Sequence, residues 1–125
     1  MEQGYLIDTN TAIDYLNNRL PAKANIIIDG HKVNISVITR MELLAWKNAT
    51  PHQINVLENF IAACTVHPLD EQTIVASIAT RRDFNIKLPD AIIASTAIVN
   101  NFTLVTRNIA DFRSIPNLGV MNSWE

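Results

Sequence analysis

Short apolar runs alternate along this chain with segments in which apolar residues recur every three or four positions. The short runs, which predict strands, are Tyr5–Ile7, Val33–Ser36, Thr65–His67, Leu104–Thr106 and Gly119–Met121. The other segments, which predict helices, are Thr11–Leu16, Ala22–Ile28, Thr39–Asn48, Pro51–Ala63, Asp70–Arg82 and Pro89–Val99, with a turn from Asn108 to Phe112. Such alternation predicts an α/β fold in which helices cover both faces of a parallel sheet.

The composition narrows the class of protein. A chain of 125 residues with 48% hydrophobic residues and a mean hydropathy of +0.10 predicts one domain, 1–125, with a substantial core. No apolar run approaches the ~20 residues of a membrane helix, and Glu2 gives the N-terminus an acid where a secretory signal has basic residues. Cys64 is the only cysteine, which fits a reducing cytoplasm. The net charge of −2 argues against binding nucleic acid by general attraction alone, so such a role requires local basic groups or metal ions.

The first predicted strand ends at Asp8, which is followed by Thr9 and Asn10. An unpaired carboxylate is costly inside an apolar interior, whereas the carboxyl end of a strand borders the ligand crevice of an open α/β sheet. Asp8, Thr9 or Asn10 can equally cap the helix that follows. This segment leaves both interpretations open.

Three further acids occupy comparable positions. Glu42 lies one turn inside the helix after the second strand, Asp90 in the first turn of the helix that Pro89 opens, and Asp111 just after the fourth strand. Each also has a structural explanation. Thr39 and Glu42 have the spacing of a capping box, and so do residue 108 and Asp111. The negative charge of Asp90 interacts favourably with the dipole of its helix at the amino end.

All of these acids are nevertheless expected at one edge of the sheet. Clustered carboxylates repel one another unless a cation neutralises them. Hard oxygen ligands select Mg²⁺ or Mn²⁺, ions that activate water for phosphodiester hydrolysis. The acids therefore predict a divalent metal site.

Four segments together resemble the motif blocks of PIN-domain ribonucleases, and in size they are similar to the VapC-type toxins of bacterial toxin–antitoxin pairs. The four segments are Leu6–Asn10, Ile35–Leu43, Leu88–Ala94 and Leu104–Asn108, so that the resemblance runs from Leu6 to about Phe112. It implies a PIN-like three-layer α/β/α fold with a central parallel sheet of about five strands. It also implies a Mg²⁺-dependent endoribonuclease that hydrolyses RNA, is held inactive by a cognate antitoxin, and is usually a homodimer.

Residue by residue, Asp8, Glu42 and Asp90 match the family's catalytic, metal-binding acids. The chain departs from the pattern at Asn108, where many members have Asp, and Asp111, three residues later, is then expected to supply the missing charge. Whether a second metal ion binds is therefore left open. Asn108 itself is a candidate contact to substrate.

Basic residues gather just before the third block. Arg81, Arg82 and Lys87 form the densest basic patch, and they are candidates to steer the backbone of an RNA strand. The alternative is a solvated helix end without a role in binding.

Competing interpretations fit less well. A haloacid-dehalogenase type of enzyme requires a second Asp two residues after Asp8, where this chain has Asn10, and a receiver domain requires adjacent acids at its first strand. The non-enzymatic alternative is a catalytically weak PIN fold that binds RNA or protein, against which the intact Asp8, Glu42 and Asp90 argue.

Two consecutive predicted helices carry more apolar surface than a small sheet covers. The residues concerned are Leu43, Leu44, Trp46, Val56, Leu57 and Phe60. We expect them to form an exposed groove that takes an amphipathic segment of a small partner protein. Alternatively, they pack on one another and on the sheet.

Overall fold

The computed structural model describes residues 4–30 and 32–124, and its centre is a parallel sheet. The strands are β1 (Gly4–Ile7), β2 (Asn34–Ser36), β3 (Thr65–His67), β4 (Phe102–Thr106) and β5 (Gly119–Asn122). They lie in the order β3-β2-β1-β4-β5, and every neighbouring pair is parallel. The predicted α/β class and parallel sheet are confirmed.

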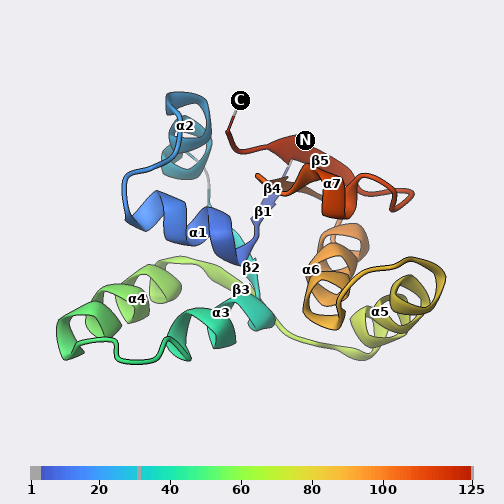
Figure 1. The fold of residues 1–125 in the computed structure, drawn as a ribbon, viewed down its shortest axis with the longest axis horizontal. Coiled ribbons are helices and arrows are strands. Elements are labelled where there is room, and N and C mark those ends of the chain that lie inside the picture. Colours follow the sequence, from blue (N-terminus) through green and yellow to red (C-terminus); the bar gives the residue numbers. More distant parts are fainter. Residues whose placement is uncertain (1–3, 31, 125) are drawn as a thin grey trace.

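Helices connect the strands and cover both faces of the sheet (Figure 1). They are α1 (Thr9–Leu16), α2 (Ala22–Gly30), α3 (Val37–Leu44), α4 (Pro51–Ala63), α5 (Glu71–Asp83), α6 (Leu88–Val99) and the short α7 (Ile109–Phe112). In the described part of the chain, no helix has the length and apolarity needed to cross a bilayer. All predicted helices are present, and their ends differ from the prediction by at most two residues, except that α3 ends four residues earlier than predicted.

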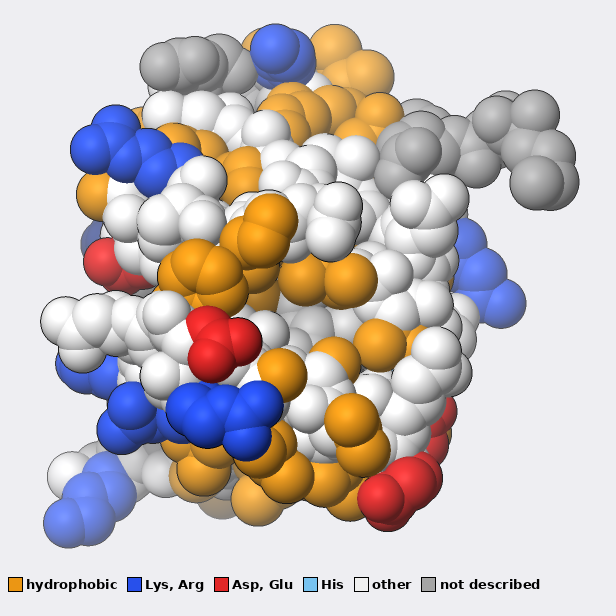
Figure 2. Space-filling model, turned by 90° about the vertical axis from the view of Figure 1, so that its right-hand side faces the viewer, with side chains coloured by type: hydrophobic (Ala, Val, Ile, Leu, Met, Phe, Trp, Pro, Cys, Tyr) orange, Lys and Arg blue, Asp and Glu red, His pale blue; other side chains and the backbone are white. Residues whose placement is uncertain are grey.

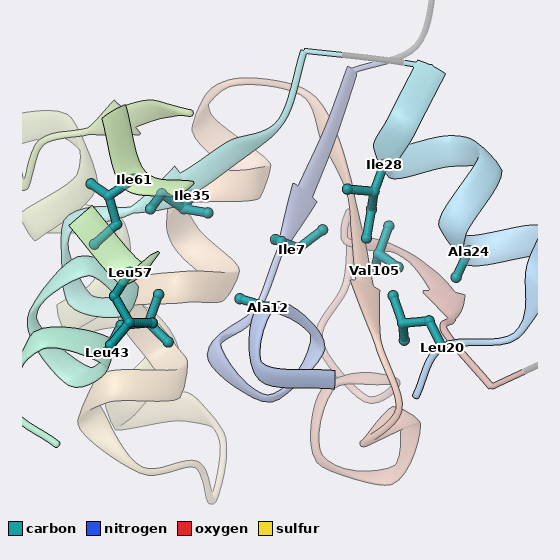
Figure 3. Close-up of a cluster of buried hydrophobic side chains, with 10 residues drawn as sticks. All are labelled: Ile7, Ala12, Leu20, Ala24, Ile28, Ile35, Leu43, Leu57, Ile61 and Val105. Carbon is teal, nitrogen blue, oxygen red and sulfur yellow. The ribbon is translucent and has the colours of Figure 1, made fainter. Parts of the chain in front are cut away.

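Neighbouring residues on the central strands face opposite sides, and this separates two cores. Leu6 and Leu104 belong to the core under α6, whereas Ile7 and Val105 belong to the core under α1 to α4. All of them are at most 1% exposed. Figure 3 shows the second of these cores, where Ile7 and Val105 meet side chains such as Leu20 from the helical layer. Because side chains alternate along a strand, apolar residues at successive positions specify a sheet buried on both faces.

Helix α5 is unusual because its buried stripe consists of small hydroxyl residues. Thr73 and Ser77 are 1% and 3% exposed, while the apolar Val75 and Ile78 are 58% and 55% exposed. The Ser77 hydroxyl satisfies its own hydrogen bond by donating to the Thr73 carbonyl at 2.7 Å. Small residues let α5 approach α6 closely, and its large apolar side chains are left on the surface.

The prediction for α3 is wrong in its bounds and its cap. The helix begins directly after β2, with Ser36 as N-cap accepting from the Ile38 amide at 3.1 Å, and it ends at Leu44. Thr39 therefore lies inside the helix and is fully buried, so that the capping box predicted for Thr39 and Glu42 does not form. The chain enters the helix at the end of the strand without a loop, one turn earlier than the local pattern indicates.

Two other caps differ from expectation. A complete capping box forms at Thr50 and Gln53, where α4 begins, and was not predicted. The cap predicted at residue 108 is absent, because Asn108 makes no side-chain capping bond to α7. Capping spacing alone is thus a weak indicator of which helix start is real.

Candidate functional site

The order of the strands makes the carboxyl ends of β1 and β4 the expected place for a ligand. The connections from these two neighbouring strands leave in opposite directions, which is the topology that opens a ligand crevice at the carboxyl ends. Asp8 follows β1 and is only 4% exposed. Its Oδ1 accepts from the Thr11 amide at 2.9 Å, and its Oδ2 accepts from the Thr106 hydroxyl at 2.5 Å. The cap predicted as one interpretation of Asp8 is therefore present, and the residue also lies at the carboxyl end of β1, where the other interpretation expects a ligand.

Glu42 reaches the same edge from α3 and is exposed. Its Oε1 accepts a hydrogen bond from the Thr9 hydroxyl at 2.6 Å. Thr9 is also 3.1 Å from the hydroxyl oxygen of Thr39. These contacts tie α3 to the first turn of α1, directly beside Asp8.

Asp90 shows that the acids lie close to one another. It is half-buried in the first turn of α6, whose N-cap Lys87 makes no side-chain capping bond. Burial raises the pKa of Asp90, and the negative charges of Asp111, Asp8 and Glu42, in that order, raise this pKa further, while Lys87 lowers it. The structure therefore brings the four predicted acids together at one edge of the sheet.

The donor set fits a hydrated Mg²⁺ ion better than an ion enclosed by protein. Within residues 4–30 and 32–124, no three His, Cys, Asp or Glu side chains are placed so that they alone hold a metal. Mg²⁺ in proteins keeps several waters and takes one or two carboxylates. Burial is the main cause of the raised pKa of Asp90, and the charges of the other acids, which a cation would neutralise, raise it further. Asp8, Glu42 and Asp90, with Asp111 beside them, are the residues that would hold it.

The predicted basic patch divides into two parts. Arg81 and Arg82 lie exposed in the last turn of α5, and Arg82 Nε is 3.6 Å from the Asp83 carboxylate. Lys87 is near enough to the acids to lower the pKa of Asp90. Asn108 is half-buried, and its amide donates to the Thr106 hydroxyl oxygen at 3.0 Å. Lys87 and Asn108 thus lie near the acids, whereas the two arginines complement the carboxyl end of a helix.

One charged pair near the site was not predicted. Arg107 Nη1 is 3.2 Å from Oδ2 of Asp14, a carboxylate that is 2% exposed in α1. The pair joins α1 to the segment that carries Asn108. Arg107 lies inside one of the motif blocks, but nothing near Asp14 in the sequence indicates its partner.

The predicted apolar groove is present between α1, α3 and α4. It has a volume of about 570 Å³, and Glu42 is among the residues that line it. Trp46, Val56 and Ile13 line it as well and are 53%, 39% and 39% exposed. The groove therefore runs from an exposed apolar surface to one of the acids. The prediction is wrong for the other apolar residues, because Leu43 and Leu57 are buried and Leu44 and Phe60 pack against the core.

Comparison with known proteins places the chain in a family. The sequence model of the PIN domain matches residues 5–118, so the chain belongs to the PIN domain family. It is 33% identical over 121 residues to Ribonuclease VapC19 of Mycobacterium tuberculosis, covering 90% of this chain and 95% of that protein. It is 30% identical over 140 residues to Ribonuclease VapC2 of Rickettsia felis, covering 97% and 98%. The resemblance to PIN-domain ribonucleases of the VapC type is confirmed.

Solved structures agree. A toxin–antitoxin complex from Klebsiella pneumoniae contains a chain with a TM-score of 0.80 and 29% identity, with 98% of this chain and 99% of that one covered. A chain of DNA-bound VapBC from Salmonella typhimurium has a TM-score of 0.82 and 27% identity, with 96% of this chain and 98% of that one covered. A chain of VapBC2 from Rickettsia felis, bound to a DNA fragment from its promoter, has a TM-score of 0.78 and 25% identity, with 97% of this chain and 98% of that one covered. The three-layer α/β/α fold is thereby confirmed.

Proposed function

We propose that this protein is the toxin of a toxin–antitoxin pair and acts as a Mg²⁺-dependent endoribonuclease. The observation that carries the proposal is the closeness of Asp111, Asp8 and Glu42 to Asp90, whose pKa is raised first by burial and then by their charges. The similarity to proteins named as ribonucleases supports RNA as the substrate. A cytoplasmic site of action agrees with the single cysteine.

The residues of the chain contribute placement and charge. Asp8, Glu42 and Asp90 would hold Mg²⁺, or Mn²⁺ in its place, which would supply a Lewis acid to polarise a phosphate oxygen and lower the pKa of an attacking water. Asp8 is held in one orientation by the Thr11 amide and the Thr106 hydroxyl. Lys87 and, more distantly along the surface, Arg81 and Arg82 provide the cationic groups that attract an RNA backbone to a protein of net charge −2.

The test is RNA cleavage by purified protein without its antitoxin. We expect cutting of a labelled RNA in Mg²⁺ or Mn²⁺ and none in excess chelator. The Asp8→Asn variant, purified in parallel, controls for a contaminating nuclease because it keeps the cap on α1. Equal cutting with chelator, or by the variant, contradicts the proposal.

The antitoxin partner is proposed to occupy the apolar groove beside Glu42. Solved relatives are toxin–antitoxin complexes, and an amphipathic segment is the ligand that such a groove takes. Trp46, 53% exposed there, provides the readout. We expect its fluorescence to shift to shorter wavelength when the antitoxin binds, and Val56→Asp to weaken binding. Unchanged affinity of that variant places the partner elsewhere.

A homodimer is proposed to form through the outer face of α5. Val75 and Ile78 are exposed there one helical turn apart, and Figure 2 shows that hydrophobic side chains are exposed on this side of the molecule, among polar and charged ones. Large exposed apolar patches mark interaction surfaces. Ile78→Glu is expected to halve the mass measured by light scattering, while Val56→Glu on α4 leaves it unchanged. A dimeric Ile78→Glu protein contradicts this surface.

The second candidate function is a binding module without useful catalysis. It is favoured by one observation, namely that no three acids in the described residues are placed to hold a metal by themselves. In the same cleavage assay, RNA that is bound but left intact at saturating Mg²⁺ supports this alternative.

A further inference from the structure

Glu42 is the acid of the site whose placement depends most on a neighbour. It is exposed on α3, and its long side chain has several rotatable bonds to restrict. Asp8, in contrast, is buried and accepts two hydrogen bonds, one of them from the backbone. The hydrogen bond from Thr9 to Oε1, at 2.6 Å, is the contact in the described structure that selects one position for the Glu42 carboxylate.

The direction of the hydrogen bonds around Thr9 follows from its single hydroxyl proton. A carboxylate only accepts, so Thr9 donates to Glu42. The 3.1 Å contact between Thr9 and Thr39 is then a bond that Thr39 donates. Thr39 is fully buried and Thr9 half-buried. A short chain of hydroxyls thus leads from the interior of α3 through Thr9 to Glu42, and each bond polarises the next.

Thr9 is itself held rigidly. It follows Asp8 directly and lies in the first turn of α1, which the Asp8 carboxylate caps at the Thr11 amide. As a β-branched residue in a helix, it also has few side-chain rotamers available. The first turn of α1 therefore determines the position of Asp8 and also, through Thr9, the position of Glu42, which is 33 residues from Thr9 in the sequence.

We propose that Thr9 is a positioning residue that holds Glu42 ready for the divalent ion. The inference rests on the proposed metal-dependent function and adds a residue to it. The Thr9 hydroxyl donates its hydrogen bond to Oε1 of Glu42. The other oxygen, Oε2, has no hydrogen bond within the described residues and remains free to act as a ligand. Removing the hydroxyl leaves Glu42 present but mobile.

The test compares variants that differ in one hydroxyl. Thr9→Val keeps the shape of the side chain and deletes the donor, Thr9→Ser keeps the donor, and Thr9→Ala is a second deletion in case the valine disturbs folding. Thr96→Val is the matched control, because the buried Thr96 hydroxyl donates only to the Ile92 carbonyl of its own helix, at 2.7 Å. Thermal melts of the metal-free proteins establish that each variant is folded.

The measurement is binding of Mn²⁺ alone, followed by the loss of the electron paramagnetic resonance signal of the free ion. We expect Thr9→Val and Thr9→Ala to bind Mn²⁺ about tenfold more weakly, as is typical when a residue that orients a metal ligand is removed. Thr9→Ser and Thr96→Val should bind as the wild type does. Activity lost by Thr9→Val at limiting Mg²⁺ should return when Mg²⁺ is raised.

The outcomes separate this inference from the proposed function. If the wild type binds Mn²⁺ and cuts RNA while Thr9→Val binds equally well, Thr9 has no positioning role. The same conclusion follows if Thr96→Val weakens binding as much as Thr9→Val, because the effect is then one of general stability. A wild type that binds no Mn²⁺ overturns the metal dependence, and the inference with it.

Discussion

Asp90→Asn distinguishes a metal ligand from a residue that only suits a helix start. Asp90 lies in the first turn of α6 and is not the N-cap of that helix, which is Lys87. The substitution therefore costs at most the helix-dipole interaction, about 0.3–1 kcal/mol. It also removes a charge that Asp111, Asp8 and Glu42 repel.

The dependence of stability on pH has a definite sign. The pKa of Asp90 in the folded protein is raised above 3.8, so the folded state holds this proton more tightly than the unfolded chain does. The contribution of Asp90 to stability is thus fully present below its ordinary pKa and is lost as the pH rises through the raised value. At neutral pH without metal, Asp90→Asn should consequently be as stable as the wild type or slightly more stable.

With metal the order should reverse. At a Mg²⁺ concentration one hundred times its dissociation constant, the wild type gains about 2.7 kcal/mol, and a variant that binds tenfold more weakly gains about 1.4 kcal/mol. For 125 residues, these gains correspond to increases in Tm of roughly 10 °C and roughly 5 °C. RNA cleavage by the variant should fall to background.

The assay is a thermal melt of both proteins with and without Mg²⁺, beside a cleavage assay on the same preparations. Asp111→Asn provides a comparison within the same cluster. An Asp90→Asn protein that cuts RNA and shows the wild-type Mg²⁺ shift would make Asp90 a structural residue and refute the site.

Three further predictions concern the site and the sheet. Asp111→Asn should keep measurable cleavage but need more Mg²⁺, as a Mg²⁺ titration will show; complete loss makes Asp111 a primary ligand. Gly4→Ala should lower the free energy of unfolding in denaturant by about 1–3 kcal/mol, because the added Cβ would lie 2.5 Å from the Phe102 ring. Gly30→Ala is the control and should not lower it, because its Cβ would meet nothing within 4 Å. Equal effects of the two substitutions would refute the clash. Burial lowers the pKa of His67 from 6.5. The contribution of His67 to stability should therefore be fully present above pH 6.5 and be lost as the pH falls below it, and His67→Gln should remove this dependence. Thermal melts from about pH 7 to about pH 5 test the sign.

The sequence itself determined most of the elements. Apolar residues at successive positions, as in Leu6 and Ile7, indicate a strand buried on both faces, and helical spacing located every long helix. Local patterns were less reliable at the ends. Thr39 and Glu42 satisfy the capping pattern as well as Thr50 and Gln53 do, yet only the second pair forms it.

The sequence also placed the four acids near the ends of strands and the starts of helices. That they meet depends on the strand order β3-β2-β1-β4-β5, which sets β1 beside β4 although 94 residues separate Thr11 from its partner carbonyl at Val105. The motif blocks indicated this arrangement only through resemblance to a family.

What tertiary structure alone decided is which side chains pair over long distances. Thr9 with Glu42 and Asp14 with Arg107 are 33 and 93 residues apart. The outward apolar face of α5 belongs here too, because helical spacing shows that a helix forms but not which face its neighbours cover. Local propensity acts over a few residues, whereas these contacts depend on how the whole sheet brings distant helices together.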